Sequence, residues 1–184
     1  MELLKPGSLW SKVIERTKTA LECQALQPIT TDYEFIEQDN IYFLIRIIFN
    51  IDRKEKDKQQ QEQKSQAKKK EFNPFLPYEK ELFVGNLSET HLCLLNKFNV
   101  VDYHLLIVTR EFEEQENWLT LEDFAAMQLV LTEIDGLAFY NGGKLAGSSQ
   151  RHKHLQVIPL PFVEGETKIP IASAIESAIF VGAI

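Results

Sequence analysis

The sequence is poor in cysteine, and its two cysteines, Cys23 and Cys93, lie far apart. No two cysteines stand at the short spacing of a zinc motif, and two distant thiols cannot form the disulfide framework of a small secreted domain. We therefore predict isolated thiols in a reducing compartment.

Long apolar runs are also missing. Residues 1–7 lack the hydrophobic stretch of a signal peptide. The longest apolar stretch, residues 41–49, is too short to span a bilayer and carries Arg46 in its middle. These absences predict a cytoplasmic protein that does not insert into a membrane.

Positive charge is in deficit, because 27 acidic residues outweigh 20 basic ones and give a net charge of −7. That balance argues against a nucleic-acid partner, whose backbone is gripped by lysine and arginine. What the chain does have is 184 residues with 44% hydrophobic side chains, enough for one globular domain, spanning residues 1–184, with its own core.

One segment breaks this ordinary composition. Residues 52–71 contain one apolar residue, Ala67, among eight basic and five acidic residues. Such a segment cannot offset its ordering entropy by burying surface, so we expect a flexible charged loop. A basic arm that attracts polyphosphate through its lysines is the alternative.

Two helices are predicted by caps and by apolar spacing. Ser8 can cap a helix that runs to about Ala25, and residues 120–123 form a capping-box-like start for a second. Their expected buried faces consist of Val13, Ile14, Ala20 and Leu21 in the first helix, and of Leu121, Phe124, Met127, Leu131 and Ile134 in the second.

Strands are predicted on both sides of the charged segment. Residues 32–37 and 41–49 indicate a hairpin joined at Asp39 and Asn40, with the second strand half-buried. Residues 73–78 should be rigid and extended, because two prolines fix the backbone. Further strands are expected at 82–85, 91–97, 104–109, 137–141 and 152–160. This order predicts an α+β fold, a largely antiparallel sheet with flanking helices.

The last predicted strand carries three polar side chains on one face. Side chains alternate along a strand, so His152, His154 and Gln156 should share one side, with Leu155 and Val157 packed on the other. Polar groups in register on a covered face each need a partner. This pattern therefore indicates that the three side chains have a functional role.

The loop before this strand contains glycines 142, 143 and 147 and serines 148 and 149. Its backbone N–H groups can turn towards an anion. An imidazole beside such a cradle suits acyl or phosphoryl transfer. Structural histidines, or a zinc site completed by His91 or His104, are the competing interpretations.

Residues 147–161, which read GSSQRHKHLQVIPLP, closely resemble the active-site strand of the diadenosine tetraphosphate phosphorylases. These ATP adenylyltransferases are a branch of the histidine-triad superfamily related to galactose-1-phosphate uridylyltransferase. Residues 73–79, 95–98 and 104–112 also match. The resemblance runs from about Tyr42 to Phe162, and more weakly through the first forty residues. It implies a histidine-triad-like fold.

The resemblance also implies a role for each matching residue. His154 would be the nucleophile that becomes a nucleotidyl-histidine, His152 would orient the strand and bind phosphate, and Gln156 would hydrogen-bond the phosphate. The remaining matches fall on groups that would hold the nucleotide. Asn96 would hold the ribose hydroxyls, Asn141 the α-phosphate and Ser149 the bridging or leaving phosphate, with Gly147, Ser148 and Gln150 beside them.

The implied reaction is phosphorolysis of diadenosine tetraphosphate to ADP and ATP, because Gln156 cannot shuttle a proton to activate water. The alternatives are a dinucleoside polyphosphate hydrolase and a nucleotide-binding protein without turnover. No protein-bound metal or covalent cofactor is expected; magnesium bound with the polyphosphate and a homodimer remain open.

The C-terminal end departs from the resemblance. Family members continue well beyond the active-site strand, whereas this chain ends 22 residues after Phe162 with the apolar stretch 180–184. We expect the C-terminal part of the family fold to be missing.

Overall fold

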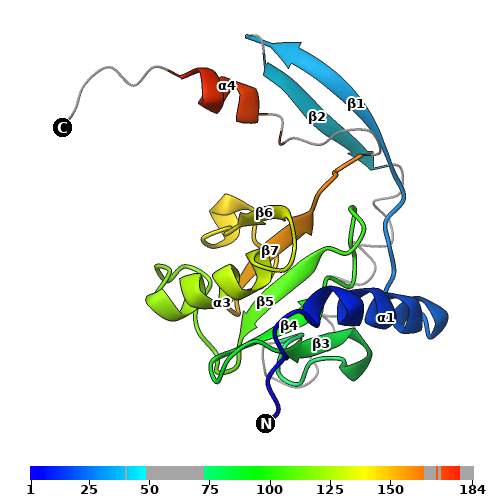
Figure 1. Ribbon diagram of the computed structural model, residues 1–184, viewed down its shortest axis with the longest axis vertical. Helices are drawn as coiled ribbons and strands as arrows, with labels where there is room; N and C mark the ends of the chain where they lie inside the picture. The colour runs from blue at the N-terminus through cyan, green and yellow to red at the C-terminus, as the bar shows by residue number, and fades with distance from the viewer. Residues whose placement is uncertain (40, 49–72, 164–168, 170, 179–184) are drawn as a thin grey trace.

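The computed structural model describes residues 1–39, 41–48, 73–163, 169 and 171–178. The charged segment 52–71 and the apolar end 180–184 lie outside the described residues. Two separate antiparallel sheets form, one of five strands and one a two-stranded hairpin (Figure 1). The prediction of an α+β fold with a largely antiparallel sheet is confirmed.

The five-stranded sheet has the strand order β3-β4-β5-β7-β6. Both faces of its central strands are covered, and every residue of β4 and β5 is buried, which is why these strands read as apolar runs. The bounds are Phe83–Asn86 for β3, His91–Leu95 for β4, Leu105–Thr109 for β5, Gly136–Phe139 for β6 and His154–Pro159 for β7.

The predicted strands are therefore found, with one shift that matters for the site. The last strand begins at His154 rather than at His152, and His152 instead forms an isolated bridge with Glu114. Two short 3₁₀ helices, η1 (Lys80–Leu82) and η2 (Lys144–Ala146), lie before β3 and after β6.

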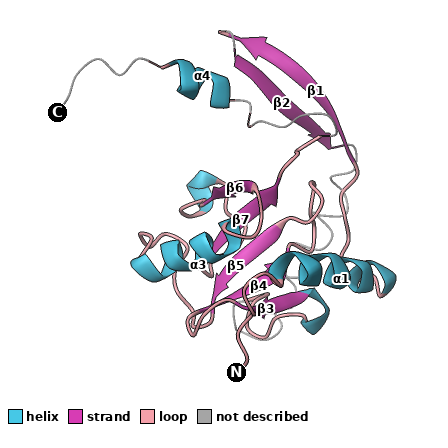
Figure 2. Ribbon diagram, in the orientation of Figure 1, coloured by secondary structure: helices cyan, strands magenta, loops and turns pink. Residues whose placement is uncertain are grey.

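One face of this sheet is covered by the helices α1 (Leu9–Glu22) and α3 (Leu121–Leu131), as Figure 2 shows. Their buried side chains form one core cluster with strand residues such as Ile107 and Leu155. The opposite face carries a smaller cluster, in which Phe75 packs on side chains of β4 and β5: Leu92, Leu94, Leu106 and Val108.

The predicted buried faces of the helices are partly wrong. In α1, Val13 and Ala20 are buried with Leu9, but Ile14 and Leu21 are exposed. The capping box of α3 between Thr120 and Asp123 is confirmed.

In α3 the correction is larger, because Leu121 is 84% exposed and Phe124 is 48% exposed. The helix is rotated so that Asp123, Ala126 and Val130 face the sheet, since the Asp123 carboxylate bonds to His91 of β4 and to Lys153, the residue before β7. Met127 and Leu131 lie at the edge of this core, and Ile134 is buried beyond the helix end.

The hairpin of β1 (Thr31–Gln38) and β2 (Ile41–Ile48) is confirmed, with Gln38 paired to Ile41. The expectation that its second strand is half-buried is wrong, because most of its side chains are exposed. The hairpin lies apart from the five-stranded sheet, and its extensive contacts are those between its own two strands (Figure 1). Its exposed large side chains are Tyr33, Phe35, Ile36, Tyr42, Phe43, Ile45, Ile47 and Ile48.

Residues 73–78 also differ from expectation, because residues 74–77 form turns rather than an extended segment. The Asn73 side chain accepts a hydrogen bond from the Phe75 amide at 2.9 Å, which bends the chain locally. A last short helix, α4, spans Ala172–Ser177. Among the described helices, none has both the length and the apolar character that a membrane span requires.

Candidate active site

The site is built on β7, which lies between β5 and β6. Leu155 and Val157 are fully buried in the helix-covered core. His154 and Gln156 stand opposite Val108 and Leu106 of β5 and share their face of the sheet. The predicted division of side chains between the two faces is therefore found.

His154 is held in one tautomer by the backbone. Its Nδ1–H donates to the carbonyl of His152 at 2.8 Å, so Nε2 carries the lone pair. Within the described part of the chain, Nε2 has no hydrogen-bond partner. Burial lowers the pKa of His154 below its ordinary value, so the ring is neutral at pH 7 with a free nucleophilic nitrogen.

His152 is fixed more completely. Its Nε2–H donates to the Thr109 carbonyl at 2.8 Å, and its Nδ1 accepts from the Asn73 side chain at 2.9 Å. The Phe75 ring lies against both His152 and His154. Burial lowers the pKa of His152 too. Both ring nitrogens thus bond to protein groups, and a phosphate contact by His152 stays a prediction.

A chain of hydrogen bonds links two predicted residues through a third. The Asn96 amide donates to His104 Nδ1 at 3.2 Å, and His104 Nε2–H donates to Gln156 Oε1 at 3.1 Å. Burial lowers the pKa of His104 to about 4, so this ring stays neutral. Sequence reasoning considered His104 only as a metal ligand, although its alternation with Leu106 and Val108 already placed it on the site face.

The glycine-bearing loop after β6 is closed by its own backbone. Gly147 has φ 95°, in the left-handed region, and the Ser148 amide bonds to the Gly143 carbonyl at 3.1 Å. The side-chain amide of Asn141 lies beside Gly147. Among the described residues, nothing accepts a hydrogen bond from the amides of Ser149 and Gln150, so these N–H groups are available to an anion.

Behind the site, on the helix-covered face, lies a charged network that sequence reasoning missed. Lys153, between the two histidines, is completely buried, and its Nζ bonds to Asp123 at 2.5 Å and to Glu113 at 3.2 Å. Asp123 also accepts from His91 Nε2 at 3.0 Å. Strand alternation gave a signal for it, because it placed a lysine on the core face, where a charge needs a partner.

The two buried charges hold each other ionised. Burial alone would lower the pKa of Lys153, but the bonds to Asp123 and Glu113 outweigh it and raise the pKa. Burial would likewise raise the pKa of Asp123, yet bonds from Lys153, the Thr120 amide and His91 lower it.

The zinc interpretation finds no support in this geometry. His91 lies on the helix-covered face, bonded to Asp123, so it cannot join His152 and His154. Within the described ranges, no three His, Cys, Asp or Glu side chains gather closely enough to hold a metal ion.

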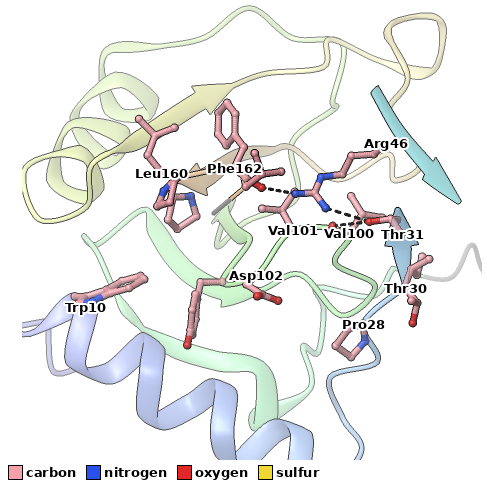
Figure 3. A pocket seen from close by; sticks show the side chains of 15 residues that line it. Trp10, Pro28, Thr30, Thr31, Arg46, Val100, Val101, Asp102, Leu160 and Phe162 are labelled. Carbon is pink, nitrogen blue, oxygen red and sulfur yellow. Dashed lines mark hydrogen bonds between the residues drawn. The ribbon is translucent and has the colours of Figure 1, made fainter. Parts of the chain in front are cut away.

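A cavity of about 560 Å³ opens elsewhere, between α1, the start of the hairpin and the chain after β7 (Figure 3). Trp10, Asp102 and Arg46 line it, and Arg46 donates to Thr31 Oγ1 and to the Phe162 carbonyl. None of the predicted site residues lines this cavity. It is distinct from the histidine site.

The chain as a whole is similar to known proteins. Residues 1–177 match the family model described as the Ap4A phosphorylase N-terminal domain. Diadenosine 5',5'''-P1,P4-tetraphosphate phosphorylase 2 of Saccharomyces cerevisiae is 40% identical over 103 residues, covering 48% of this chain and 32% of that protein. Protein APA1 of the same yeast is 37% identical over 86 residues, covering 43% and 27%.

Solved structures give the same result. Yeast Ap4A phosphorylase Apa2 in complex with AMP matches with a TM-score of 0.69 and 26% identity, over 87% of this chain and 52% of that one. Its complex with Ap4A shares the fold with a TM-score of 0.75 at 24% identity, over 99% and 60%. The chain thus spans about a third of the matched curated relatives and little more than half of the solved chains. Because the family model matches nearly the whole length of this chain, the chain belongs to the Ap4A phosphorylase N-terminal domain family.

Proposed function

We propose that this protein is a nucleotidyltransferase that cleaves diadenosine tetraphosphate with inorganic phosphate to ADP and ATP. One observation carries the proposal: the buried, neutral His154 ring, whose Nδ1–H is held by the His152 carbonyl while Nε2 stays free. Two of the matched yeast proteins, diadenosine tetraphosphate phosphorylase 2 and the solved Apa2, are named as phosphorylases of this dinucleotide, which supports the choice of substrate.

In the first step, His154 Nε2 attacks the α-phosphorus of one adenosine. The bond from phosphorus to the bridging oxygen breaks, ATP leaves, and an adenylyl group remains on Nε2. The ring becomes positively charged, and its Nδ1–H bond to the His152 carbonyl strengthens as a charge-assisted bond.

In the second step, a phosphate oxygen attacks the same phosphorus, the P–N bond breaks, and ADP forms. Gln156 favours this acceptor over water. Its Oε1 already accepts from His104, so its NH₂ group is left to donate to phosphate oxygens. A carboxamide cannot remove a proton from water, whereas phosphate at neutral pH already carries a nucleophilic oxygen.

The remaining predicted contacts complete the proposal. Asn96 would bind the ribose hydroxyls, and Asn141 with the free amides of Ser149 and Gln150 would bind the phosphates, next to Gly147 and Ser148. Magnesium would be carried by the polyphosphate, because its preferred oxygen ligands come from phosphates and water. A homodimer and a cytoplasmic location stay predictions.

The test is product analysis with radiolabelled diadenosine tetraphosphate, with and without phosphate. We expect ADP and ATP in equal amounts, formed only with phosphate, and an adenylylated peptide containing His154 after acid-free quenching. A His154→Ala variant should lose at least about 10³-fold in turnover, whereas a variant of the exposed Gln128 should keep full activity.

Three other outcomes would each contradict one part of the proposal. AMP formed without phosphate would indicate a hydrolase. Nucleotide binding by calorimetry without any product would indicate a binding protein. Full turnover by His154→Ala would remove the nucleophile assignment.

A further inference from the structure

The ladder between β6 and β7 stops short of the candidate nucleophile. The pairs run from Gly136 with Pro159 to Phe139 with Gln156. Continuing this register by two residues would place Asn141 directly opposite His154. On the other edge of the strand, the Lys153 carbonyl bonds to the Thr109 amide, so the N–H and C=O of His154 point towards β6.

A side chain, rather than the β6 backbone, meets these two groups. Gln115 Oε1 accepts from the His154 amide at 2.8 Å, and Gln115 Nε2 donates to the His154 carbonyl at 3.0 Å. The same Nε2 donates its other hydrogen to the Asn141 carbonyl at 2.9 Å. The carboxamide is thus inserted into the ladder between His154 and Asn141, with every polar hydrogen used.

Gln115 is itself firmly held. The residue is 2% exposed, its amide donates to the Arg151 carbonyl at 2.8 Å, and its carbonyl accepts from the Tyr140 hydroxyl. These bonds fix its backbone to the segment before His152 and to the residue before Asn141. The insertion therefore has a defined position between the two strands.

We propose that Gln115 is a positioning residue that sets the separation between His154 and Asn141, so that an α-phosphate fits between them. This inference rests on the proposed function, in which His154 attacks that phosphate and Asn141 contacts it. Residues paired directly across an antiparallel ladder have Cα atoms about 5.5 Å apart or closer. An interposed carboxamide widens this gap and keeps it constant while the ring nitrogen attacks in line.

The chemistry of the position selects glutamine. It requires two donors for two carbonyls and one acceptor for an amide, which a carboxamide supplies and a methionine of similar length does not. An ionised glutamate keeps the acceptor but has no donor for either carbonyl. Gln115→Met and Gln115→Glu therefore remove different parts of the contact while preserving most of the volume.

The experiment is a single-turnover measurement with diadenosine tetraphosphate and the enzyme in excess, which reports the rate constant for adenylylation regardless of the fraction of active protein. We expect Gln115→Met to lower this rate constant about 10²-fold, with nucleotide affinity changed less than about threefold. Gln128→Met, on the exposed side of α3, is the matched control and should equal the wild type.

If Gln115→Met does not fold, the rate constant of Gln115→Glu provides an independent test. Its deficit should shrink as the pH falls from 8 towards 5, because the neutral carboxyl regains one donor. Partial unfolding of the variant would reduce the concentration of folded enzyme, but it would not change the rate constant of the folded molecules when the folded enzyme remains in saturating excess. A Gln115→Met rate constant within twofold of wild type, or a Gln115→Glu deficit that does not vary with pH, would overturn the positioning role alone. A wild type that forms no adenylyl-histidine would overturn the proposed function itself.

Discussion

The two sheets of this protein both contain β-branched and aromatic residues, but they bury these residues to different extents. In β4 and β5 every side chain is buried, and β7 of the same sheet carries His154, whose ring bonds to the His152 carbonyl. In the hairpin, seven of the eight residues of β1 are exposed, among them the large side chains of Tyr33, Phe35 and Ile36. β-branched and aromatic residues thus specify a strand, but only covering elements decide whether the strand is a core.

The largest expected effect lies in the charged network behind the five-stranded sheet. Asp123→Ala would leave Lys153 and His91 buried without their shared carboxylate. We expect the free energy of unfolding to fall by about 3–5 kcal/mol, measured by urea denaturation. Glu122→Ala, at the exposed neighbouring position on the same helix, should have little effect, and equal losses from the two variants would contradict the network.

The second prediction concerns packing in the same sheet. Ile107 is completely buried in the core beneath the helices. Ile107→Ala should reduce the free energy of unfolding by about 2–5 kcal/mol, because it removes buried methylenes and leaves a cavity. A loss below about 1 kcal/mol, at an unchanged slope against urea, would show that the core can close over the cavity.

The third prediction is a pH dependence that belongs to the site face. Burial lowers the folded-state pKa of His104 to about 4, and the unfolded value is near 6.5. The unfolded chain therefore binds the proton first, and this contribution to stability is complete above pH 6.5 and is lost as the pH falls towards 4. His104 alone should contribute a loss on the order of 2 kcal/mol at pH 5.

Urea titrations at pH 7 and pH 5 measure this loss. His104→Gln keeps a hydrogen-bonding side chain but cannot titrate, so its stability should change less between the two pH values. If wild type and variant lose the same amount, the acid sensitivity arises elsewhere.

The smallest effect is expected in the hairpin. Ile47 is 37% exposed in β2, so Ile47→Ala should cost under about 1 kcal/mol, against the larger loss at Ile107. A cost near that of Ile107→Ala would mean that something covers the hairpin in solution. Light scattering of the wild type and of Ile47→Ala would then show whether a second copy of the chain covers the hairpin, as the predicted homodimer would allow.

Local patterns predicted much of the fold and part of the site. Alternation along residues 152–160 placed His154 and Gln156 on one face, and the capping box marked the start of α3 at Leu121. Both signals depend on neighbours in sequence.

Contacts between distant segments could not be predicted in this way. Gln115 meets His154 across 39 residues, and Asp123 meets Lys153 across 30. Burial likewise depends on which distant segments pack against an element. The predicted burial of α3 and of the hairpin was therefore wrong.

The acceptor of the His154 Nδ1 proton also bears on how long an adduct survives. A carboxylate in that place could remove the Nδ1 proton from the cationic adduct, and the leaving group would then be an imidazolide anion, which departs poorly. The His152 carbonyl has too little basicity to do so. In the proposed reaction the adenylylated ring therefore stays cationic, an easily expelled leaving group, and the covalent species is short-lived whenever an acceptor is at hand.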